Sequence, residues 1–375
     1  MNNSLVVDIL YPNKYSRWRN LEINFFMDEF NSDILVFKID GFAGVDFKCD
    51  FEFANLNSNL KLQNYNILIF DPKYNYLNNY NKNIDGTLFN NKFHGSYLIT
   101  KNTDFNLNNY SFIYHIFLMC YTEFNHYYSF DYNKQLIHLY PGGGFTGNLF
   151  DLNRINKNTK IISTSPITTK LLEQSNEYDF IEVTIAPMFY KYEKNKTKNL
   201  NDGQLIICFS SLGDGTEKGD NKYITIINEY KLKYPTDDVK FISIGNCKKH
   251  HNIINYPPMD YIELQSFYYN NIDIYLNLET GKSFNGWPLG MEALKSGSVL
   301  ITTDSLNVSG FYDLRLNPFY ITNNLNEYAE IIKLLYIDRN LLLSKSKEGQ
   351  KFVEKYSSYE NQQEKIKKYI NEKIL

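Results

Sequence analysis

Residues 272–304 read IDIYLNLETGKSFNGWPLGMEALKSGSVLITTD, and this stretch decides the fold. It opens with a short apolar run at 272–278, passes through a polar loop, and closes with a second apolar run at 298–303. Between the runs, small residues and a proline precede a helical pattern that begins near Leu289. A strand, a loop, a helix and another strand in succession form the repeating unit of an α/β protein with a mainly parallel sheet.

The same alternation extends over the rest of the chain. Short apolar runs rich in β-branched or aromatic residues predict strands, and longer stretches with apolar residues at helical spacing predict helices. The predicted strands are 34–39, 66–70, 136–140, 159–164, 205–210 and 239–244, and the predicted helices include 21–30, 166–174 and 223–234.

The polar stretch KYEKNKTKNLNDG at 191–203 has no periodicity and predicts a linker. We therefore expect two domains, 1–197 and 198–356, each with its own sheet. The tail from residue 357 to 375 has Ile366, Tyr369 and Ile370 on one helical face, and we expect that helix to pack back on the first domain.

Composition excludes several classes of function. Lys+Arg total 39 and Asp+Glu total 42, so a net charge of −3 gives no overall basic field for nucleic acid and favours at most peripheral membrane contact. None of the four cysteines forms a CxxC pair, as expected for reduced thiols. The N-terminus lacks a basic and apolar leader, and the most apolar run, 112–121, is half the ~20 residues of a membrane span. We expect a cytoplasmic protein.

A glycine-rich loop follows the strand predicted at 136–140. Gly142, Gly143, Gly144 and Gly147 formally satisfy GxGxxG, but the acidic residue that binds a dinucleotide ribose about 20 positions later is missing. NAD(P) and FAD are therefore disfavoured. A loop that approaches a ligand closely and an ordinary tight turn both remain open.

A second glycine-rich loop lies in LIICFSSLGDGTEKGD at 205–220 and contains Lys218. The spacing does not fit a Walker A motif, because Lys218 is followed by Gly219. A lysine at a strand-to-helix turn can bind phosphate as a point charge, and the simpler alternative is a solvated loop lysine.

The helix start in the opening stretch has the features of an anion site. Small residues and a proline at a helix N-terminus leave backbone N–H groups and a positive dipole end free for a diphosphate. Glu292, one turn into that helix, would accept hydrogen bonds from sugar hydroxyls. Alternatively, Glu292 only stabilises the helix dipole, and Trp287 is only a core or interface aromatic.

With these motifs in order, the sequence resembles retaining family 4 of the nucleotide-sugar-dependent glycosyltransferases, which have the GT-B fold. The family pattern E-x-F-G-x-P-x-x-E-A-x-A-x-G-x-P-V corresponds to SFNGWPLGMEALKSGSVLITTD here, and the family's G-R-L-x-x-x-K-G corresponds to residues 209–212 and 218–219. Upstream, IISTSPITTKLLEQ at 161–174 and IEVTIAPMFYKY at 181–192 resemble the end of the family's first domain. The resemblance implies two Rossmann-like α/β domains whose parallel sheets face an interdomain cleft.

The resemblance also assigns roles. Lys218 would contact the donor diphosphate, Glu292 would bind the ribose, and the glycine loop would lie across the cleft near the transferred sugar or the acceptor. Among the histidines, His138 is the preferred third catalytic candidate because it precedes that loop on the same strand. The donor-binding positions implied are Ser211, Gly245, Asn246, Asn285, Gly286, Trp287, Pro288, Leu289 and Gly290. Among them, the loop with Gly245 and Asn246 would lie near the nucleotide base.

Two positions depart from the family pattern. Ser211 stands where the family has an arginine, and Phe284 stands where it has the first of two acids, with Glu279 as the nearest acid upstream. No D-x-D triplet occurs in the chain, so no metal and no cofactor beyond the nucleotide-sugar co-substrate is expected.

The resemblance thus implies transfer of a sugar from a UDP- or GDP-sugar to a glycan, lipid-linked or protein acceptor, with retained configuration. The alternatives are a sugar-nucleotide epimerase, a sugar phosphorylase, or an inactive subunit that binds the sugar nucleotide.

Overall fold

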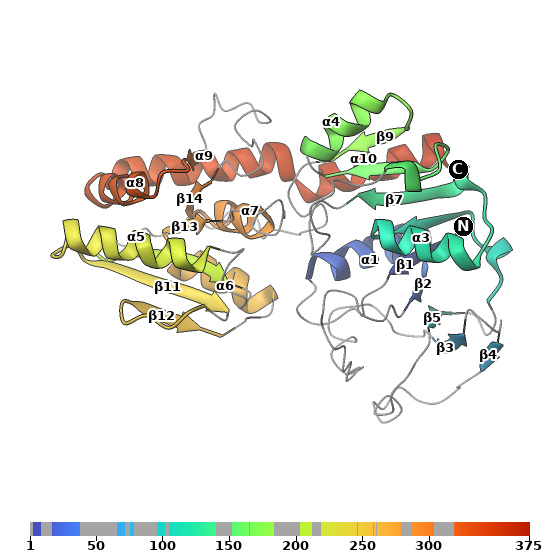
Figure 1. Cartoon of the computed structure of the whole chain (residues 1–375), viewed down its shortest axis with the longest axis horizontal. Helices are drawn as coiled ribbons and strands as arrows, with labels where there is room; N and C mark the ends of the chain where they lie inside the picture. Colours follow the sequence, from blue (N-terminus) through green and yellow to red (C-terminus); the bar gives the residue numbers. More distant parts are fainter. Residues whose placement is uncertain are drawn as a thin grey trace.

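The computed structural model describes residues 3–8, 17–37, 66–71, 76–78, 96–101, 105–139, 152–164, 166–183, 203–211, 219–245, 247–257, 259, 261–278, 287–303 and 319–375. Within them the chain forms two separate β-sheets with helices on their faces (Figure 1). The boundary predicted near residue 198 lies outside the described residues.

The first sheet has the strand order β4-β3-β5-β2-β1-β6-β7-β8-β9. Its strands are β1 (Ser4–Asp8), β2 (Asp33–Val36), β3 (Asn66–Asp71), β4 (Tyr76–Asn78), β5 (Ser96–Thr100), β6 (Phe112–His115), β7 (Gln135–Leu139), β8 (Lys160–Ser163) and β9 (Phe180–Glu182). The strands β2, β1, β6, β7, β8 and β9 are adjacent and parallel. Beyond β2, the strands β5, β3 and β4 extend the sheet with antiparallel pairs. This sheet is therefore mixed, with a parallel part of the expected kind.

Helices cover both faces of the parallel part of the first sheet. They are α1 (Arg17–Phe30), α3 (Leu118–Tyr127), α4 (Pro166–Ser175) and, from the end of the chain, α10 (Tyr359–Lys373). Val6 packs with α1 on one face, while Leu5 and Val7 pack with α3 on the other. This alternation follows from the two-residue period of a strand, which points successive side chains to opposite faces.

The second sheet has the order β12-β11-β10-β13-β14-β15, and every neighbouring pair is parallel. Its strands are β10 (Leu205–Ser211), β11 (Val239–Gly245), β12 (Ile253–Tyr256), β13 (Ile274–Asn277), β14 (Val299–Thr302) and β15 (Tyr320–Ile321). Its helices are α5 (Asp220–Lys233), α6 (Tyr261–Asn271), α7 (Trp287–Lys295), α8 (Leu325–Ile337) and α9 (Arg339–Ser357). Numbered along the chain, the order is 3-2-1-4-5-6, which is that of the doubly wound nucleotide-binding fold.

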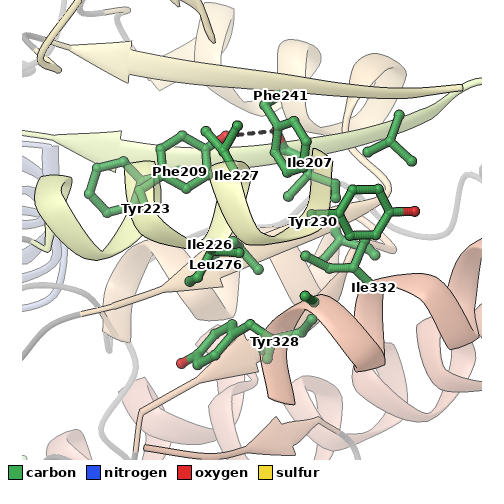
Figure 2. Close-up of a cluster of buried hydrophobic side chains, with 14 of the residues drawn as sticks. Ile207, Phe209, Tyr223, Ile226, Ile227, Tyr230, Phe241, Leu276, Tyr328 and Ile332 are labelled. Carbon is green, nitrogen blue, oxygen red and sulfur yellow. Dashed lines mark hydrogen bonds between the residues drawn. The ribbon is translucent and has the colours of Figure 1, made fainter. Parts of the chain in front are cut away.

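A dense apolar cluster holds α5 and α8 on one face of this sheet (Figure 2). Phe209 stacks on Tyr223 with ring centroids 4.9 Å apart, and Tyr223 also donates a hydrogen bond to the Ile242 carbonyl across 2.8 Å. These two aromatic rings bury much apolar surface, and the Tyr223 hydroxyl that comes with them has a hydrogen-bond partner. The opposite face packs against α6, α7 and α9.

The last two helices connect the two sheets. Gln350 on α9 donates to the Lys295 carbonyl at the end of α7, and the following helix α10 packs against the first sheet (Figure 1). Ile366 and Ile370 are fully buried there, and Tyr369 donates to Asp179 across 3.1 Å. The α10 face identified from the sequence is the face that is buried.

Two further features complete the fold. Cys120, Cys208 and Cys247 are buried free thiols. None of the helices in the described part of the chain combines the length and the apolar composition needed to span a membrane.

Candidate functional site

The strand order of the second sheet reverses between β10 and β13. After β10 the chain enters α5 and adds strands on one side, whereas after β13 it enters α7 and adds strands on the other. In open parallel sheets such a reversal leaves a crevice outside the carboxyl ends of the strands, where ligands bind. The two motifs singled out from the sequence follow these two strands. The one with Lys218 follows β10, and the one with Glu292 follows β13.

Two of the predicted donor residues are neighbours at this edge. Ser211, the last residue of β10, pairs in the parallel ladder with Gly245, the last residue of β11. Gly245 has a φ of 98°, in the left-handed region that glycine enters without a steric penalty. The strand therefore ends in a sharp change of direction at the position expected beside the base.

Gly219, the residue after Lys218 in the sequence, packs against the residue that follows β13. Lys218 itself lies outside the described residues, but its chain neighbour Gly219 is the residue immediately before α5, with a φ of 90°. A Cβ atom at Gly219 would stand 2.7 Å from both the Cβ and the carbonyl oxygen of Leu278, which follows β13. The close approach of these two backbones requires glycine, and it brings the start of α5 against the strand that leads to α7.

Asp220 ties the start of α5 to the loop after β11. Its fully buried carboxylate accepts a hydrogen bond from the backbone N–H of Lys248 across 3.1 Å. Burial, reinforced by the charge of Asp220, raises the pKa of the nearby Cys247 thiol to about 11, so this thiol stays protonated at neutral pH. Asp220 thus links the first residue of α5 to the described part of the loop after β11.

Glu292 lies on α7 and is 6% exposed, between the fully buried Met291 and Ala293. Its charge acts on Tyr268 of α6: burial, together with smaller contributions that include Glu292, raises the pKa of Tyr268 well above its usual value. The Tyr268 hydroxyl lies 3.2 Å from the Ser210 hydroxyl near the end of β10. Tyr268 thus contacts Ser210, the residue before Ser211, and lies within electrostatic range of Glu292.

At the first sheet, His138 of β7 is 2% exposed and both of its ring nitrogens have protein partners. Nδ1 lies 2.8 Å from Glu22 Oε1 on α1, and Nε2 lies 3.2 Å from the Thr164 hydroxyl after β8. The Tyr114 hydroxyl of β6 donates to the same oxygen of Glu22. The predicted candidate is thus one member of a buried polar network.

Other predicted positions are placed less fully. The backbones of Ser211, Trp287, Pro288 and Leu289 lie in β10 and α7, and Gly290 is buried in α7. Lys218, Asn246, Asn285, Gly286, Gly142, Gly143 and Gly144 lie outside the described residues. Among the residues that are described, no group of three or more His, Cys, Asp or Glu side chains is arranged to hold a metal ion.

The sequence analysis missed four residues of this arrangement: Glu22, Thr164, Asp220 and Tyr268. Glu22 gives the clearest retrospective signal, because it lies three and four positions before Phe25 and Phe26 and so shares their buried helix face. Asp220 lies directly after the Lys218-Gly219 pair, at a helix start where an acid is favoured. Neither signal indicates which distant residue Glu22 or Asp220 contacts in the folded chain.

Comparison with known proteins identifies the fold. No family model and no curated protein matches the sequence. Sucrose-phosphate synthase from Thermosynechococcus elongatus superposes with a TM-score of 0.60 at 10% identity, covering 99% of this chain and 98% of that one. HepE of Anabaena, solved with UDP and glucose, gives 0.59 at 9% identity over 99% and 100% of the two chains.

Trehalose-6-phosphate synthase OtsA gives a TM-score of 0.50 at 11% identity, covering 69% of this chain and 72% of that one. With the strand order of the second sheet, these likenesses establish the GT-B fold for this chain. The fold predicted from the sequence is confirmed.

Proposed function

We propose that the chain is a glycosyltransferase that moves a sugar from a nucleoside diphosphate sugar, a UDP- or GDP-sugar, to a glycan, lipid-linked or protein acceptor. We infer further that the transferred carbon keeps its configuration and that no metal takes part. The full-length likeness to sucrose-phosphate synthase supports the first statement, and the sequence motifs support the second.

One observation supports the proposal most strongly. The segments expected to bind the donor were identified independently along the sequence, and their described parts meet at one sheet edge. Ser211 pairs with Gly245, Gly219 contacts Leu278, and Asp220 joins α5 to the loop after β11. That edge is the strand-order reversal at which a doubly wound sheet binds its nucleotide.

The proposed reaction exchanges one bond for another at the sugar C1. The bond from C1 to the diphosphate oxygen breaks, a hydroxyl oxygen of the acceptor bonds to C1, and the hydroxyl proton leaves with the nucleoside diphosphate. Negative charge therefore develops on the diphosphate. Lys218 and the N-terminus of α7 would stabilise that charge, and preorganised groups of this kind often supply the largest part of a rate enhancement.

Glu292 would bind the nucleotide rather than take part in bond exchange. An ionised carboxylate accepts hydrogen bonds through both oxygens and so suits the two hydroxyls of a ribose. Its position on α7, one turn after the residues that would cradle the phosphates, fits a nucleotide lying along the strand ends.

The experiment is a transfer assay with Lys218→Ala and Glu292→Ala. We expect both changes to reduce turnover about a hundredfold or more, since each removes a group from a charged or buried interaction. Lys351→Ala and Glu354→Ala on the exposed side of α9 are the matched controls and should keep full turnover. Circular dichroism checks that all four variants fold.

The outcomes separate the alternatives. Wild-type turnover in both site variants would overturn the site assignment. Product formation without any acceptor would favour an epimerase. Tight donor binding with no turnover would favour an inactive subunit, which the serine at position 211 in place of the family's arginine would fit.

A further inference from the structure

Four buried side chains, three from α1, β6 and β7 and one from the residue after β8, form a continuous polar network near the carboxyl edge of the first sheet. The Glu22 network consists of Tyr114, Glu22, His138 and Thr164, none more than 3% exposed. Tyr114 and His138 both contact Glu22 Oε1, and the other ring nitrogen of His138 contacts the Thr164 hydroxyl. Glu22 and His138 are 116 residues apart in sequence, so the fold has brought them together.

The network runs from α1 to the edge at which a parallel sheet binds ligands. His138 is the penultimate residue of β7, and Thr164 directly follows the last residue of β8. The two strands are adjacent and parallel, with His138 in register with Ile162. Thr164 is therefore the member of the network at the carboxyl ends of the strands, where ligands of such sheets lie.

The contact with Glu22 favours one direction of the hydrogen bonds. A carboxylate oxygen beside Nδ1 favours the tautomer whose single ring hydrogen lies on Nδ1, and in that tautomer Nε2 is an acceptor. The Thr164 hydroxyl then donates its single hydrogen to Nε2 and keeps only acceptor capacity on its oxygen. Each donor in the network thus points toward Glu22.

We propose that Glu22 is a positioning residue which, through His138, holds the Thr164 oxygen as an acceptor for a hydroxyl of the transferred sugar. This inference rests on the proposed function and adds to it a sugar-side contact in the first domain. A sugar offers hydroxyl groups as hydrogen-bond donors. Because the Thr164 hydroxyl hydrogen is already donated to His138, its oxygen can accept such a hydrogen bond without reorganising.

The surroundings of Glu22 support this direction. Burial, followed by the charge of Glu22, raises the pKa of the Tyr114 hydroxyl well above its ordinary value, so Tyr114 keeps its proton and remains a donor. Cys120 on α3 and Asp8 on β1 act on Tyr114 in the same sense. A buried carboxylate is costly unless donors satisfy it, and here two donors converge on Oε1, while Oε2 has no hydrogen-bond partner among the described residues.

The first experiment determines which ring nitrogen of His138 carries a hydrogen, and it needs no activity assay. In ¹⁵N-edited NMR of the imidazole groups, with His138→Asn used for assignment, we expect the His138 ring to carry a hydrogen on Nδ1 and none on Nε2. In Glu22→Gln the amide can present either an oxygen or an NH₂ group, so both tautomers should appear. Protonation at Nε2 in the wild type, or an unchanged tautomer in the variant, would overturn the proposal.

The second experiment measures affinity for UDP-glucose and for UDP, which lacks the sugar, with GDP-glucose and GDP as a second pair. Glu22→Gln and Thr164→Val should each reduce the preference for the sugar-bearing ligand about tenfold while leaving the bare nucleotide unaffected. Thr164→Val is the nearly isosteric variant in case Glu22→Gln folds poorly. Glu29→Gln, on the same helix but paired with Lys367 at the surface, is the control and should change neither affinity.

The results are distinguishable from a failure of the proposed function. If neither nucleotide pair binds the wild type, the proposed function is wrong, and the NMR result alone decides the direction of the network. If a sugar nucleotide binds and its preference over the bare nucleotide is the same in Glu22→Gln, Thr164→Val and the wild type, the sugar contact is wrong while the transferase proposal stands.

Discussion

The Asp220 carboxylate accepts a hydrogen bond from the backbone N–H of Lys248, 28 positions later in the sequence, across 3.1 Å. This contact connects the first turn of α5 to the loop after β11. The two segments contain or adjoin the residues expected at the diphosphate and at the base. A single buried carboxylate therefore holds together both ends of the proposed donor site.

Asp220→Ala should weaken both the fold and donor binding. The change removes the acceptor of a buried N–H group and a negative charge at a helix N-terminus, so we expect a loss of about 2 kcal/mol in the free energy of unfolding. Urea denaturation measures that loss. Glu229→Ala removes an acid from the same helix that pairs with Lys233 at the surface, and it should cost less than about 0.5 kcal/mol. Equal losses in the two variants would contradict the anchoring role.

Gly219→Ala should be strongly destabilising. The new Cβ would stand 2.7 Å from backbone and side-chain atoms of Leu278, at a φ that L-residues disfavour. We expect a loss of about 3 kcal/mol, measured by urea denaturation. Gly203→Ala is the matched control, since nothing lies within 4 Å of its added Cβ, and it should be close to neutral. A Gly219→Ala protein as stable as the control would mean that the two backbones do not approach as described.

Ile370→Ala tests the packing of α10 on the first sheet. Ile370 is fully buried in the cluster that contains Phe26 and Tyr114, and truncation of such a side chain costs about 3 kcal/mol through lost contacts and a cavity. Lys368→Ala changes the exposed face of the same helix and should be nearly neutral. Thermal unfolding followed by circular dichroism compares the two variants. Equal midpoints would show that α10 does not depend on that contact.

The stability of the chain should fall as the pH is lowered below about 6.5 because of His115. Burial lowers the pKa of this histidine to about 3, and its hydrogen bond with Gln135 only partly opposes the shift. Between pH 6.5 and 3 the unfolded chain therefore binds a proton that the folded chain does not. The folded state loses up to about 1.4 kcal/mol per pH unit across that window and keeps its full stability above it.

The comparison for this pH effect is His115→Asn, which keeps a polar partner for Gln135 but does not titrate. Denaturation at a series of pH values should give a shallower slope between pH 6.5 and 3 for the variant. The same slope in both proteins would assign the acid sensitivity to other groups.

Local pattern was enough to predict the elements that make the framework. The run at 205–210 became β10, and the helix predicted near Leu289 begins at Trp287, because proline is tolerated in the first turn of a helix. The apolar run at 112–121 was harder to interpret: it contains the whole of β6 and the start of α3, and a period of two and a period of 3.6 look alike over so few residues.

Partners across the fold could not be predicted in the same way. The composition of α1 shows that Glu22 shares a face with Phe25 and Phe26, but nothing local shows that this face meets His138. The same holds for Asp220 and Lys248. Such contacts depend on the strand order of the sheet, which single-sequence patterns leave open. The resemblance to a family supplied the order of the motifs and hence the fold.

The most direct test of the central claim is a thermal-shift screen of the full chain against nucleoside diphosphate sugars. A ligand that binds the folded chain alone at a hundred times its Kd stabilises it by about 2.7 kcal/mol. We predict that one UDP- or GDP-sugar raises the Tm of the wild type and of Glu354→Ala by several degrees and leaves Glu292→Ala unshifted. No shift with any sugar nucleotide, or an equal shift in Glu292→Ala, would contradict a donor site at the carboxyl edge of the second sheet.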